Sequence, residues 1–456
     1  REIKQRRAQH AAPKIVSDGV SWPALRRQLS FELTGAQQRA ISDIQQDFAS
    51  ARPALRLVQG DVGCGKTIVA AAAALQAVDS GLQVAIMAPT ELLAEQHRRN
   101  FMAWCAPLNI RVGWLTSRLP AAEKRAAREA IESGEVQIAI GTHALFQDSV
   151  IFARLGMIVV DEQHRFGVDQ RLALKNKGRT STQQPHQLIM SATPIPRSLS
   201  MVYYADLDVS NIDELPPGRQ PVNTVVLPNT RRDEVQARIQ LACSEGRQAY
   251  WVCPLIEESE VLQAEAASNT AAMLSESLDG VRVALIHGKM KPAEKDRLMQ
   301  AFRAAEIDLL VATTVIEVGV DVPNASLMII ENAERLGLAQ LHQLRGRVGR
   351  GDAAAVCVLM YQTPLGKTSR RRLDIMRQTS DGFEIARHDL EFRGPGELMG
   401  TRQTGDHSLK VADIVRDQNL LPLVEQAARS LLESCPQNIQ PIIDRWVMHK
   451  AQYAEV

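Results

Sequence analysis

The chain has 456 residues, of which 45% are hydrophobic and 23% charged, and its formal net charge is +1. This length is enough for two or three domains, and the balanced charge excludes a uniformly basic surface for a polyanionic partner. The six cysteines form no C-x-x-C pair and no zinc-ligand spacing with histidine, and no apolar run approaches the roughly 18 residues of a membrane span; we therefore expect reduced thiols, no zinc site and no membrane partner.

The chain begins REIKQRRAQH, with neither an initiator Met nor an apolar leader. We expect no secretory signal, a cytoplasmic location, and a piece of a longer or processed protein. Residues 1–30 are predicted to form a helix and a connector. From about residue 55, short apolar runs alternate with helix-like segments, which is typical of a parallel sheet covered by helices. This first α/β unit is predicted over 31–210, with strands at LRLVQ, LQVAIMA, VQIAIG, GMIVVD and QLIMSA.

A second α/β unit follows a short linker. NIDELPPGRQP, with three prolines and a glycine, predicts a linker over 211–222. The unit itself is predicted over 223–363, with strands at VNTVVLP, QAYWVCPL, VRVALIHG, IDLLVATT, ASLMIIE and AAVCVLMY. Residues 364–456 are predicted to be mainly helical, with a loop at RGPGELMGTRQTG. The predicted fold class is therefore α/β, with two tandem parallel-sheet domains and a helical C-terminal region.

GDVGCGKT lies between the first predicted strand and the helix after it, as a P-loop requires. Gly60, Gly63 and Gly65 let the backbone N–H groups turn toward phosphates at the N-terminus of the helix. Lys66 is expected to reach the β- and γ-phosphates of ATP, and the Thr67 hydroxyl to ligate Mg²⁺. The alternative is a glycine turn that matches by chance.

LGMIVVDEQHRFGV places two carboxylates directly after an apolar strand. In the same unit as a P-loop, Asp161 is expected to hold Mg²⁺, and Glu162 to orient and deprotonate the attacking water. The alternatives are a pair of helix-capping carboxylates and a protein that binds nucleotide without hydrolysing it.

QLHQLRGRVGRG, in the second unit, contains Arg345 and the candidate catalytic residues Gln343, Arg347 and Arg350 on a helix-like segment. Arg347 and Arg350 are three residues apart and are expected to share a helix face. An arginine that faces the nucleotide from the second domain accelerates phosphoryl transfer by on the order of 10³–10⁵. The alternatives are a solvated basic helix and a nucleic-acid contact.

Eight motifs stand in order along the chain: GDVGCGKT, APTELLAEQ, GTHALF, DEQHRFGVDQR, SATPIPR, IHGKM, TTVIEVGVDVPNA and LAQLHQLRGRVGRG. With this order the chain resembles the superfamily 2 helicases, most closely the RecG family of bacterial branch-migration helicases, from LTGAQQRA (33–40) to GTRQTGD (400–406). The resemblance implies two RecA-like domains that bind ATP and Mg²⁺ between them. The transcription-repair coupling translocases share some of these sequence motifs. However, DEQHRFGV, with His164, and APTELLAEQH match the RecG family better.

The resemblance also implies roles for individual residues. Gln37 would read the adenine, and Gly319 and Asp321 would face the nucleotide. Thr90, Thr142 and Thr314 would contact DNA phosphates, which suits binding without base specificity. Ser191 and Thr193, in SAT, would couple hydrolysis to domain movement.

DLEFRGPGELMGTRQTG, in the C-terminal region, resembles the helical hairpin and loop with which RecG and coupling translocases move along duplex DNA. Arg393 and Gln403 would act in it, with Gly394, Gly396 and Gly400 as pivots. From composition alone, a C-terminal cap with a glycine-rich turn is the alternative. KTSRRRLDIMR, over 367–377, is interpreted either as a solvated helix face or as a DNA-backbone contact. The isolated histidines at 97, 186, 388 and 407 are interpreted as structural.

The predicted function is that of an ATP-dependent helicase and translocase on double-stranded DNA. It would drive branch migration and remodel stalled replication forks and Holliday junctions in recombination and repair. Its partners would be double-stranded and branched DNA and a single-stranded-DNA-binding protein, and it would act as a monomer. A coupling-factor-like duplex translocase and a non-catalytic nucleic-acid scaffold with a relic nucleotide site are the alternatives. Residues 1–30 are too few for the wedge domain, an OB-fold that precedes the motor in the RecG family.

Overall fold

The computed structural model describes residues 11–15, 19–50, 52–162, 177, 183–192, 207–217, 219, 221–254, 260–313, 322–351, 353–398 and 416–446. Within these residues no helix is both long enough and apolar enough to cross a membrane.

The first domain is built on a parallel sheet that is buried on both faces. In its described part the strand order is β3-β4-β2-β5-β6-β1-β7, and every neighbouring pair is parallel. Val84 and Ile86 bury in one apolar core, while Ala85 and Met87 bury in the other, because successive side chains point to opposite faces. The strands are β1 (Leu55–Gly60), β2 (Gln83–Met87), β3 (Val112–Leu115), β4 (Ile138–Gly141), β5 (Leu155–Asp161), β6 (His186–Ser191) and β7 (Asp208–Ile212).

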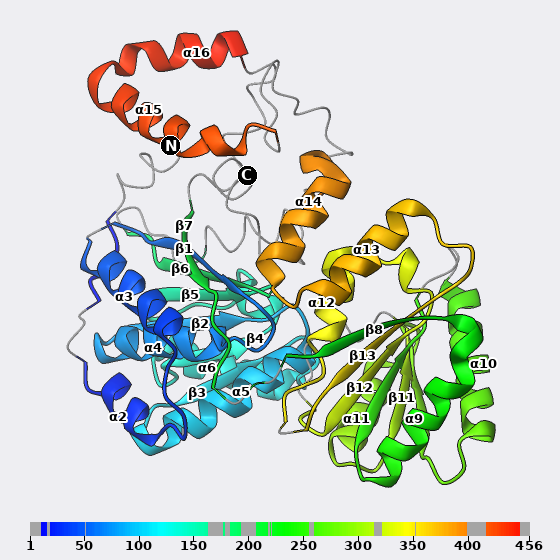
Figure 1. Ribbon diagram of the computed structural model, residues 1–456. Helices are drawn as coiled ribbons and strands as arrows, with labels where there is room; N and C mark the ends of the chain where they lie inside the picture. Colours follow the sequence, from blue (N-terminus) through cyan, green and yellow to red (C-terminus); the bar gives the residue numbers. More distant parts are fainter. Residues whose placement is uncertain are drawn as a thin grey trace.

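The helices that cover the first sheet come from the N-terminal part of the chain, before β1 and between β1 and β4 (Figure 1). They are α2 (Ser21–Gln28), α3 (Gly35–Ala49), α4 (Lys66–Asp79), α5 (Glu91–Cys105) and α6 (Ala121–Glu132), with short 3₁₀ turns η1 (Ala106–Leu108) and η2 (His143–Phe146). Helix α3 begins at a capping box: the Thr34 hydroxyl accepts from the Gln37 N–H, and the Gln37 side chain accepts from the Thr34 N–H. Helix α4 is rich in buried alanines, which let α2 and α3 pack closely against it.

The second domain repeats this plan. Among the described residues its strand order is β10-β11-β9-β12-β13-β8, again with parallel neighbours. Tyr250 and Val252 bury in the core shared with α11 to α14, whereas Ala249 and Trp251 bury in the core shared with α9 and α10. The elements are β8 (Asn223–Pro228), η4 (Asn229–Arg231), α9 (Arg232–Ser244), β9 (Gln248–Val252), α10 (Glu260–Ser277), β10 (Val283–Ile286), α11 (Pro292–Arg303), β11 (Leu309–Ala312), β12 (Ala325–Ile330), η6 (Ala333–Arg335), α12 (Leu338–Arg345) and β13 (Val356–Tyr361).

The C-terminal region is helical, as expected. Its elements are α13 (Lys367–Gln378), α14 (Gly382–Leu398), η8 (Gln418–Leu420), α15 (Leu421–Ser434), η9 (Pro436–Asn438) and α16 (Ile439–Trp446). Helices α13 and α14 pack on the second domain, and α14 rises over the junction of the two domains (Figure 1). The expectation of a loop from Arg393 is wrong at its start, because α14 continues to Leu398. Gly394 and Gly396 therefore lie within a helix, and Gly400 lies outside the described residues.

The predicted fold class is confirmed: two RecA-like parallel-sheet domains are followed by a mainly helical region. Two strands, β3 and β7, were not predicted from the sequence. Strand β3 is only four residues long, and β7, with sequence DVSNI, has only two apolar residues, Val209 and Ile212, among its five. Strand β7 forms by pairing with β1, where the Gln59 amide also donates to the Asn211 side chain over 2.8 Å.

Candidate nucleotide site at the junction of the two domains

Candidate residues of the first domain follow the carboxyl ends of parallel strands, so they gather at one edge of the sheet. Gly60 ends β1, Asp161 ends β5, Ser191 ends β6 and Thr142 follows β4. Thr90 follows β2 and caps α5, where its hydroxyl accepts from the Leu93 N–H over 3.4 Å. Parallel topology alone thus brings together residues that are widely separated in sequence.

The phosphate loop runs from Gly60 to the first residue of α4, Lys66. Gly63 and Gly65 have φ angles of +79° and +88°, a region that favours glycine. The Lys66 ammonium donates to the carbonyls of Gly60, over 2.7 Å, and Asp61, over 2.9 Å. Its charge therefore lies inside the loop, at the N-terminus of α4, where phosphate binding is favoured.

The loop is held from two sides. The Gln37 amide donates to the Cys64 carbonyl over 2.8 Å, so α3 is fixed to the loop. Arg219, from the linker, donates to the Val62 carbonyl. Cys64 is buried, and this burial raises the pKa of its thiol. The sulfur is therefore a packing group of the loop and a poor nucleophile.

Asp161 and Glu162 lie where β5 leaves the sheet. Asp161 is 7% exposed. Glu162 has a φ of +52°, which is unusual for a residue with a side chain. Its N–H donates to the Met190 carbonyl over 2.9 Å, and its Oε1 accepts from the Ala192 N–H over 3.0 Å. Glu162 is thus bound to the SAT segment, at the end of β6.

The residues present fit ATP and Mg²⁺ by their chemistry. A glycine loop at a helix N-terminus and an ammonium suit phosphates, and the Thr67 hydroxyl and Asp161 carboxylate are the oxygen ligands that Mg²⁺ prefers. Among the described residues there is no cluster of three or more His, Cys, Asp or Glu side chains that would form an all-protein metal cage.

The second domain meets the phosphate loop through α12. His342 Nε2 lies 2.9 Å from Asp61 Oδ1, and a Cβ on Gly346 would lie 2.9 Å from the Val62 Cβ. Gln343 and Arg347 are buried, and Arg350 is half-buried. The expectation that Arg347 and Arg350 share a helix face is wrong, because α12 ends at Arg345 and Gly349 has a φ of +76°. Both arginines instead lie in the turn directly after the Gly346 contact.

Asp61 also contacts the C-terminal helices; we call Asp61, His342, Arg345 and Gly382 the Asp61 junction. The Gly382 N–H, at the start of α14, donates to Asp61 Oδ2 over 3.3 Å. A Cβ on Gly382 would lie 1.7 Å from Asp61 Oδ1, so only glycine fits there. Arg345 donates to His342 Nδ1 over 3.0 Å, which leaves His342 Nε2 as the donor to Asp61. Arg345 also donates to the carbonyls of Met376 and Thr379, each over 2.9 Å, where α13 ends.

Charge and burial oppose each other at this junction. Burial by itself would raise the pKa of Asp61. The hydrogen bonds from His342 and Gly382 and the charge of Lys66 outweigh burial and hold this pKa below its usual value. Burial lowers the pKa of Arg345. Asp61 is therefore a carboxylate of the phosphate loop, and its negative charge contacts both α12 and the start of α14.

His97 is a site residue that the sequence interpretation missed. As an isolated histidine it is interpreted as structural, yet its Nε2 lies 2.8 Å from Asp161 Oδ2. His97 shares the buried face of α5 with Leu93, Ala94 and Phe101. A polar residue at a core position of an amphipathic helix was the signal that could have found it.

Several expected residues cannot be placed. Thr193, Thr314, Gly319, Asp321, Gln403 and His164 lie outside the described residues, and for Arg393 only the backbone is described. Thr142 is 4% exposed, and its hydroxyl has no hydrogen-bond partner among the described residues.

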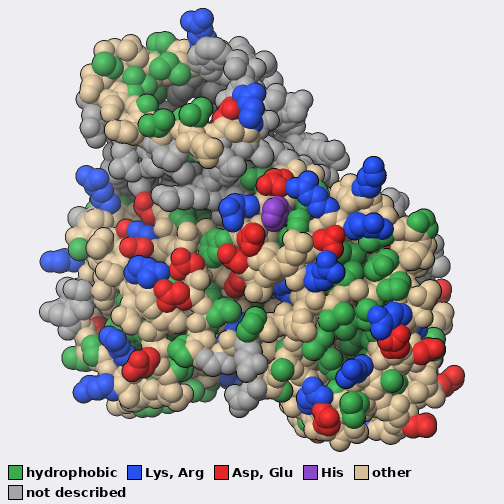
Figure 2. Space-filling view, in the orientation of Figure 1, with side chains coloured by type: hydrophobic (Ala, Val, Ile, Leu, Met, Phe, Trp, Pro, Cys, Tyr) green, Lys and Arg blue, Asp and Glu red, His purple; other side chains and the backbone are tan. Residues whose placement is uncertain are grey.

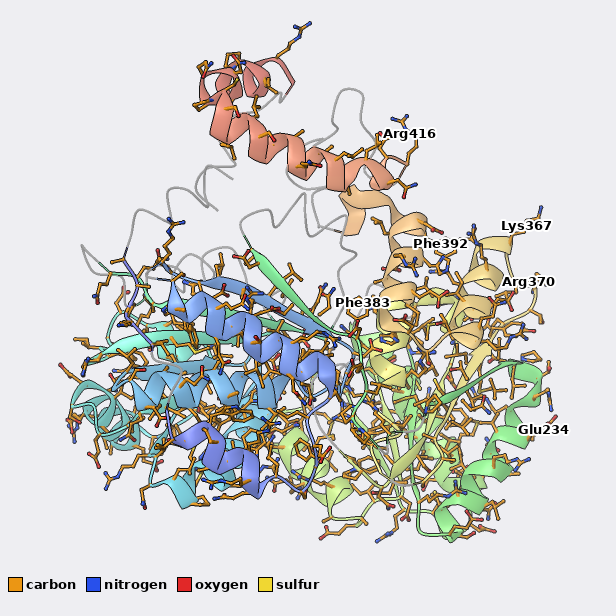
Figure 3. All side chains as sticks on the ribbon, turned by 60° about the vertical axis from the view of Figure 1, so that its left-hand side comes forward. Glu234, Lys367, Arg370, Phe383, Phe392 and Arg416 are labelled. Atoms are coloured by element: carbon orange, nitrogen blue, oxygen red, sulfur yellow. The ribbon has the colours of Figure 1, made fainter. Side chains whose placement is uncertain are left out.

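The basic cluster of α13 divides into two groups. Arg372 donates to the carbonyls of Glu334 and Leu336, so it holds η6. Arg371 lies over the Phe392 ring, at 5.3 Å from its centroid. Lys367 and Arg370 are exposed on the outer side of α13 (Figure 3). Lys and Arg side chains lie over this part of the surface, around α13 and α14 (Figure 2).

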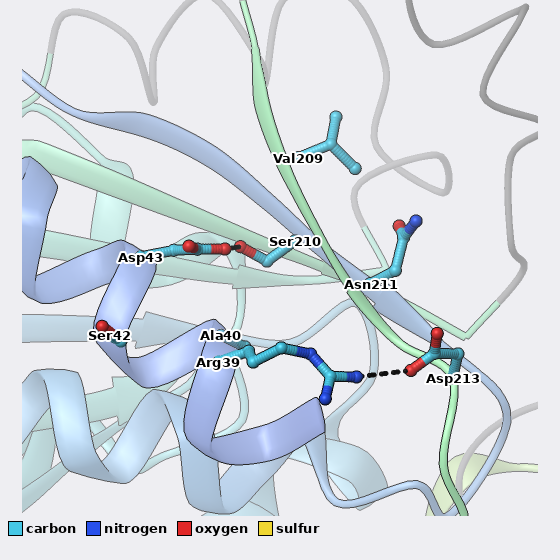
Figure 4. A pocket seen from close by; sticks show the side chains of 8 residues that line it. All are labelled: Arg39, Ala40, Ser42, Asp43, Val209, Ser210, Asn211 and Asp213. Atoms are coloured by element: carbon cyan, nitrogen blue, oxygen red, sulfur yellow. Dashed lines mark hydrogen bonds and ion pairs between the residues drawn. The ribbon is translucent and has the colours of Figure 1, made fainter. Parts of the chain in front are cut away.

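A separate polar pocket of about 340 Å³ lies between α3 and β7 (Figure 4). Arg39 crosses it to pair with Asp213 over 3.1 Å, and the Ser210 hydroxyl donates to Asp43 over 2.6 Å. Glu214, beside it, accepts from the Ala36 N–H. These contacts fasten the start of the linker to the N-terminal end of α3, and they assign the pocket a structural role.

Three family models match successive parts of the chain. DEAD/DEAH box helicase matches 34–202, Helicase conserved C-terminal domain matches 233–352, and ATP-dependent DNA helicase RecG, domain 3, C-terminal matches 379–451. A solved structure of RecG bound to a three-way DNA junction has a TM-score of 0.77 and 41% identity, covering 92% of this chain and 54% of that chain. The helicase MrfA bound to DNA and AMPPNP, with a TM-score of 0.61 and 16% identity, shares the fold alone.

Two relatives show how far the similarity extends. The ATP-dependent DNA helicase RecG of Escherichia coli K12 is 58% identical over 446 residues, which are 98% of this chain and 64% of that protein. RecG of Acidithiobacillus ferridurans is 53% identical over 456 residues, which are 100% of this chain and 66% of that protein. This chain thus spans slightly less than two thirds of these relatives. From these matches and the ordered motifs, the chain belongs to the RecG family of ATP-dependent DNA helicases.

Proposed function

We propose that this chain is an ATP-dependent motor that moves along double-stranded DNA. Its full-length protein would drive branch migration and remodel stalled forks and Holliday junctions in recombination and repair. The observation that carries the proposal is the Asp61 junction, where one carboxylate of the phosphate loop contacts both α12 and the first residue of α14. Support for a branched DNA partner comes from the solved relative, which is bound to a three-way junction.

In the proposed hydrolysis, Lys66 leaves the loop carbonyls to neutralise the β- and γ-phosphates. Thr67 and Asp161 would hold Mg²⁺, which would supply positive charge to the phosphates. Glu162 takes the proton of the attacking water. Arg347 and Arg350 approach the γ-phosphate from the second domain, since the turn that carries them follows the Gly346 contact with the loop.

Four further residues complete the proposed nucleotide site. Gln343, buried at the end of α12, positions the turn that carries the arginines. Gln37 exchanges its present contact with Cys64 for the adenine edge. Gly319 and Asp321 face the nucleotide from the second domain.

Coupling to movement is proposed to use two routes. Phosphate release changes the contacts of Glu162 with the SAT segment, which contains Ser191 and Thr193. It also changes the position of Asp61, which holds the start of α14. Helix α14 contains Arg393 and precedes Gln403 in the sequence, and we propose that these two residues press on duplex DNA.

The grip on DNA is proposed to rest on phosphate contacts. Thr90, Thr142 and Thr314 would contact one strand, and exposed Lys367 and Arg370 would add positive charge. Such contacts carry no base specificity, which suits a motor that moves on any sequence. They also agree with the near-neutral charge of the whole chain.

Two alternatives are weaker. A coupling-factor-like translocase would share the Asp61 junction, but the relatives reported above carry the RecG name over nearly the whole chain. A non-catalytic scaffold is disfavoured because Lys66, Glu162 and Arg350 are all present. We further propose that the protein acts as a monomer in the cytoplasm, with a single-stranded-DNA-binding protein as partner.

Displacement of a labelled third strand from a linear triplex tests movement along duplex DNA. The wild-type chain should release the third strand only with ATP and Mg²⁺, and Lys66→Ala should release none. Release by Lys66→Ala at the wild-type rate would contradict an ATP-driven motor, as would ATP hydrolysis on duplex DNA without any release.

A further inference from the structure

His97 occupies a position where an apolar residue would be expected. It is 3% exposed, and its neighbours on the buried face of α5 are Leu93, Ala94 and Phe101. An imidazole in a core costs free energy unless it is hydrogen-bonded, whereas an apolar residue would carry no such cost. The hydrogen bond to Asp161 offsets this cost and connects α5 to the end of β5.

Another buried histidine in the same domain shows what a structural role looks like. His186, 1% exposed on β6, accepts from the Ala54 N–H over 3.2 Å and contacts the Pro13 carbonyl over 2.9 Å. Its partners are backbone groups of neighbouring segments. His97 differs because its partner is the carboxylate expected to hold Mg²⁺.

The contact between His97 and Asp161 identifies the donor and acceptor atoms. A carboxylate only accepts hydrogen bonds, so His97 Nε2 carries the proton that points to Asp161 Oδ2. This bond limits the rotation of the carboxylate and engages Oδ2, so Oδ1 is the oxygen left for a cation or its waters. Partners of this kind orient metal-ligating carboxylates in many proteins, and their removal typically costs about 10–100-fold in metal affinity or activity.

We propose that His97 is a positioning residue for Mg²⁺: its Nε2–H holds Asp161 so that Oδ1 faces the ion or one of its waters. The proposal rests on the function proposed above for Asp161. His97 contacts neither nucleotide nor reacting atoms, so it acts only through the carboxylate.

Nucleotide binding, measured with a fluorescent ATP analogue across a Mg²⁺ titration, tests the proposal without turnover. The readout is the ratio of nucleotide affinities with Mg²⁺ and with EDTA. His97→Leu, which removes the donor, and His97→Asn, which is too short to reach Oδ2, should both lower this ratio by about 10–100-fold. His97→Gln should restore it to near the wild-type value, because its Nε2 can take the place of the imidazole donor.

His186→Leu is the matched control, since it removes a buried histidine from the same domain. It should lower the melting temperature without changing the ratio. A wild-type ratio in both His97→Leu and His97→Asn would overturn the proposal, as would an equal fall in His186→Leu. A wild-type protein whose nucleotide affinity does not depend on Mg²⁺ would instead overturn the assigned role of Asp161, and the positioning role with it.

Discussion

At the scale of one residue, Glu162 is held in a fixed position that suits the catalytic role proposed for it. Its left-handed backbone, with a φ of +52°, costs on the order of 1–3 kcal/mol for such a residue and is typical of functional positions. The bonds to Met190 and Ala192 hold it in place across β5 and β6. The side chain is therefore aimed by the sheet and needs no nucleotide to reach its position.

Glu162→Gln should retain nucleotide binding, because the amide oxygen can still accept from the Ala192 N–H. Hydrolysis should fall by about 10²–10⁴-fold, since the attacking water loses its general base. Nucleotide affinity and single-turnover phosphate release measure the two effects separately. Glu123→Gln, an exposed position on α6, is the control. Near-normal phosphate release by Glu162→Gln would remove Glu162 from its assigned role.

At the scale of elements, the Asp61 junction joins three of them. The phosphate loop, α12 and the start of α14 meet at one carboxylate, and Arg345 adds the end of α13. If the phosphate loop moves when it binds phosphate, Asp61 moves with it, and its hydrogen bonds with His342 and Gly382 change. The junction is therefore a direct connection between the candidate nucleotide site and the C-terminal helices.

Gly382→Ala tests this connection without altering a charged group. The added Cβ would lie 1.7 Å from Asp61 Oδ1, so the carboxylate must move, while alanine keeps α14 helical. Duplex-stimulated ATPase should largely remain. Third-strand displacement per ATP hydrolysed should fall on the order of 5–150-fold, the range of a coupling free energy of about 1–3 kcal/mol.

Gly366→Ala, before α13, is the matched control, because a Cβ there would meet nothing within 4 Å. It should behave as wild type in both assays. Equal losses of ATPase and displacement in Gly382→Ala would indicate a folding role for the junction and contradict a coupling role.

The elements also show what the sequence could and could not predict. Strands such as MIVVD were predictable because a strand buried on both faces has a continuous apolar pattern. Strand β7 was not, since its DVSNI depends on pairing with β1. The continuation of α14 through Gly394 and Gly396 opposes local propensity, and local propensity is what the prediction used.

The site was predictable only where it is contiguous in sequence. Lys66, Asp161 and Glu162 belong to motifs whose neighbours define the chemistry. The contacts of His97 with Asp161 and of Asp61 with Gly382 join residues 64 and 321 positions apart. No local pattern encodes such distances, so these contacts required the fold.

At the scale of the whole molecule, we propose that DNA is contacted mainly through its phosphate backbone. Phe31 is the one aromatic residue among the exposed large apolar side chains of the described residues. Platforms for stacking single-stranded bases are therefore scarce on this part of the protein. In this proposal the exposed positive charge on α13 would be the main attraction for DNA.

The affinity of the chain for duplex DNA should accordingly fall steeply with salt. The expected slope of log affinity against log salt is about −0.9 for each phosphate contact. Lys367→Ala and Arg370→Ala should each reduce the slope by about 1, whereas Arg377→Ala should change it little, since Arg377 pairs with Asp374 over 3.2 Å. Linear and forked DNA of equal length should give similar slopes. A salt-independent affinity, or one that strongly favours the fork, would contradict backbone contact as the main source of binding.

The central claim is that both RecA-like domains form one ATP site and that duplex DNA activates it. Steady-state phosphate release by the wild-type chain and by Arg350→Ala, with and without linear duplex DNA, tests it most directly. The wild type should be stimulated severalfold or more by the duplex, and Arg350→Ala should lose about 10³–10⁵-fold of the stimulated rate. Equal rates with and without duplex, or a stimulated rate in Arg350→Ala close to that of the wild type, would contradict the claim.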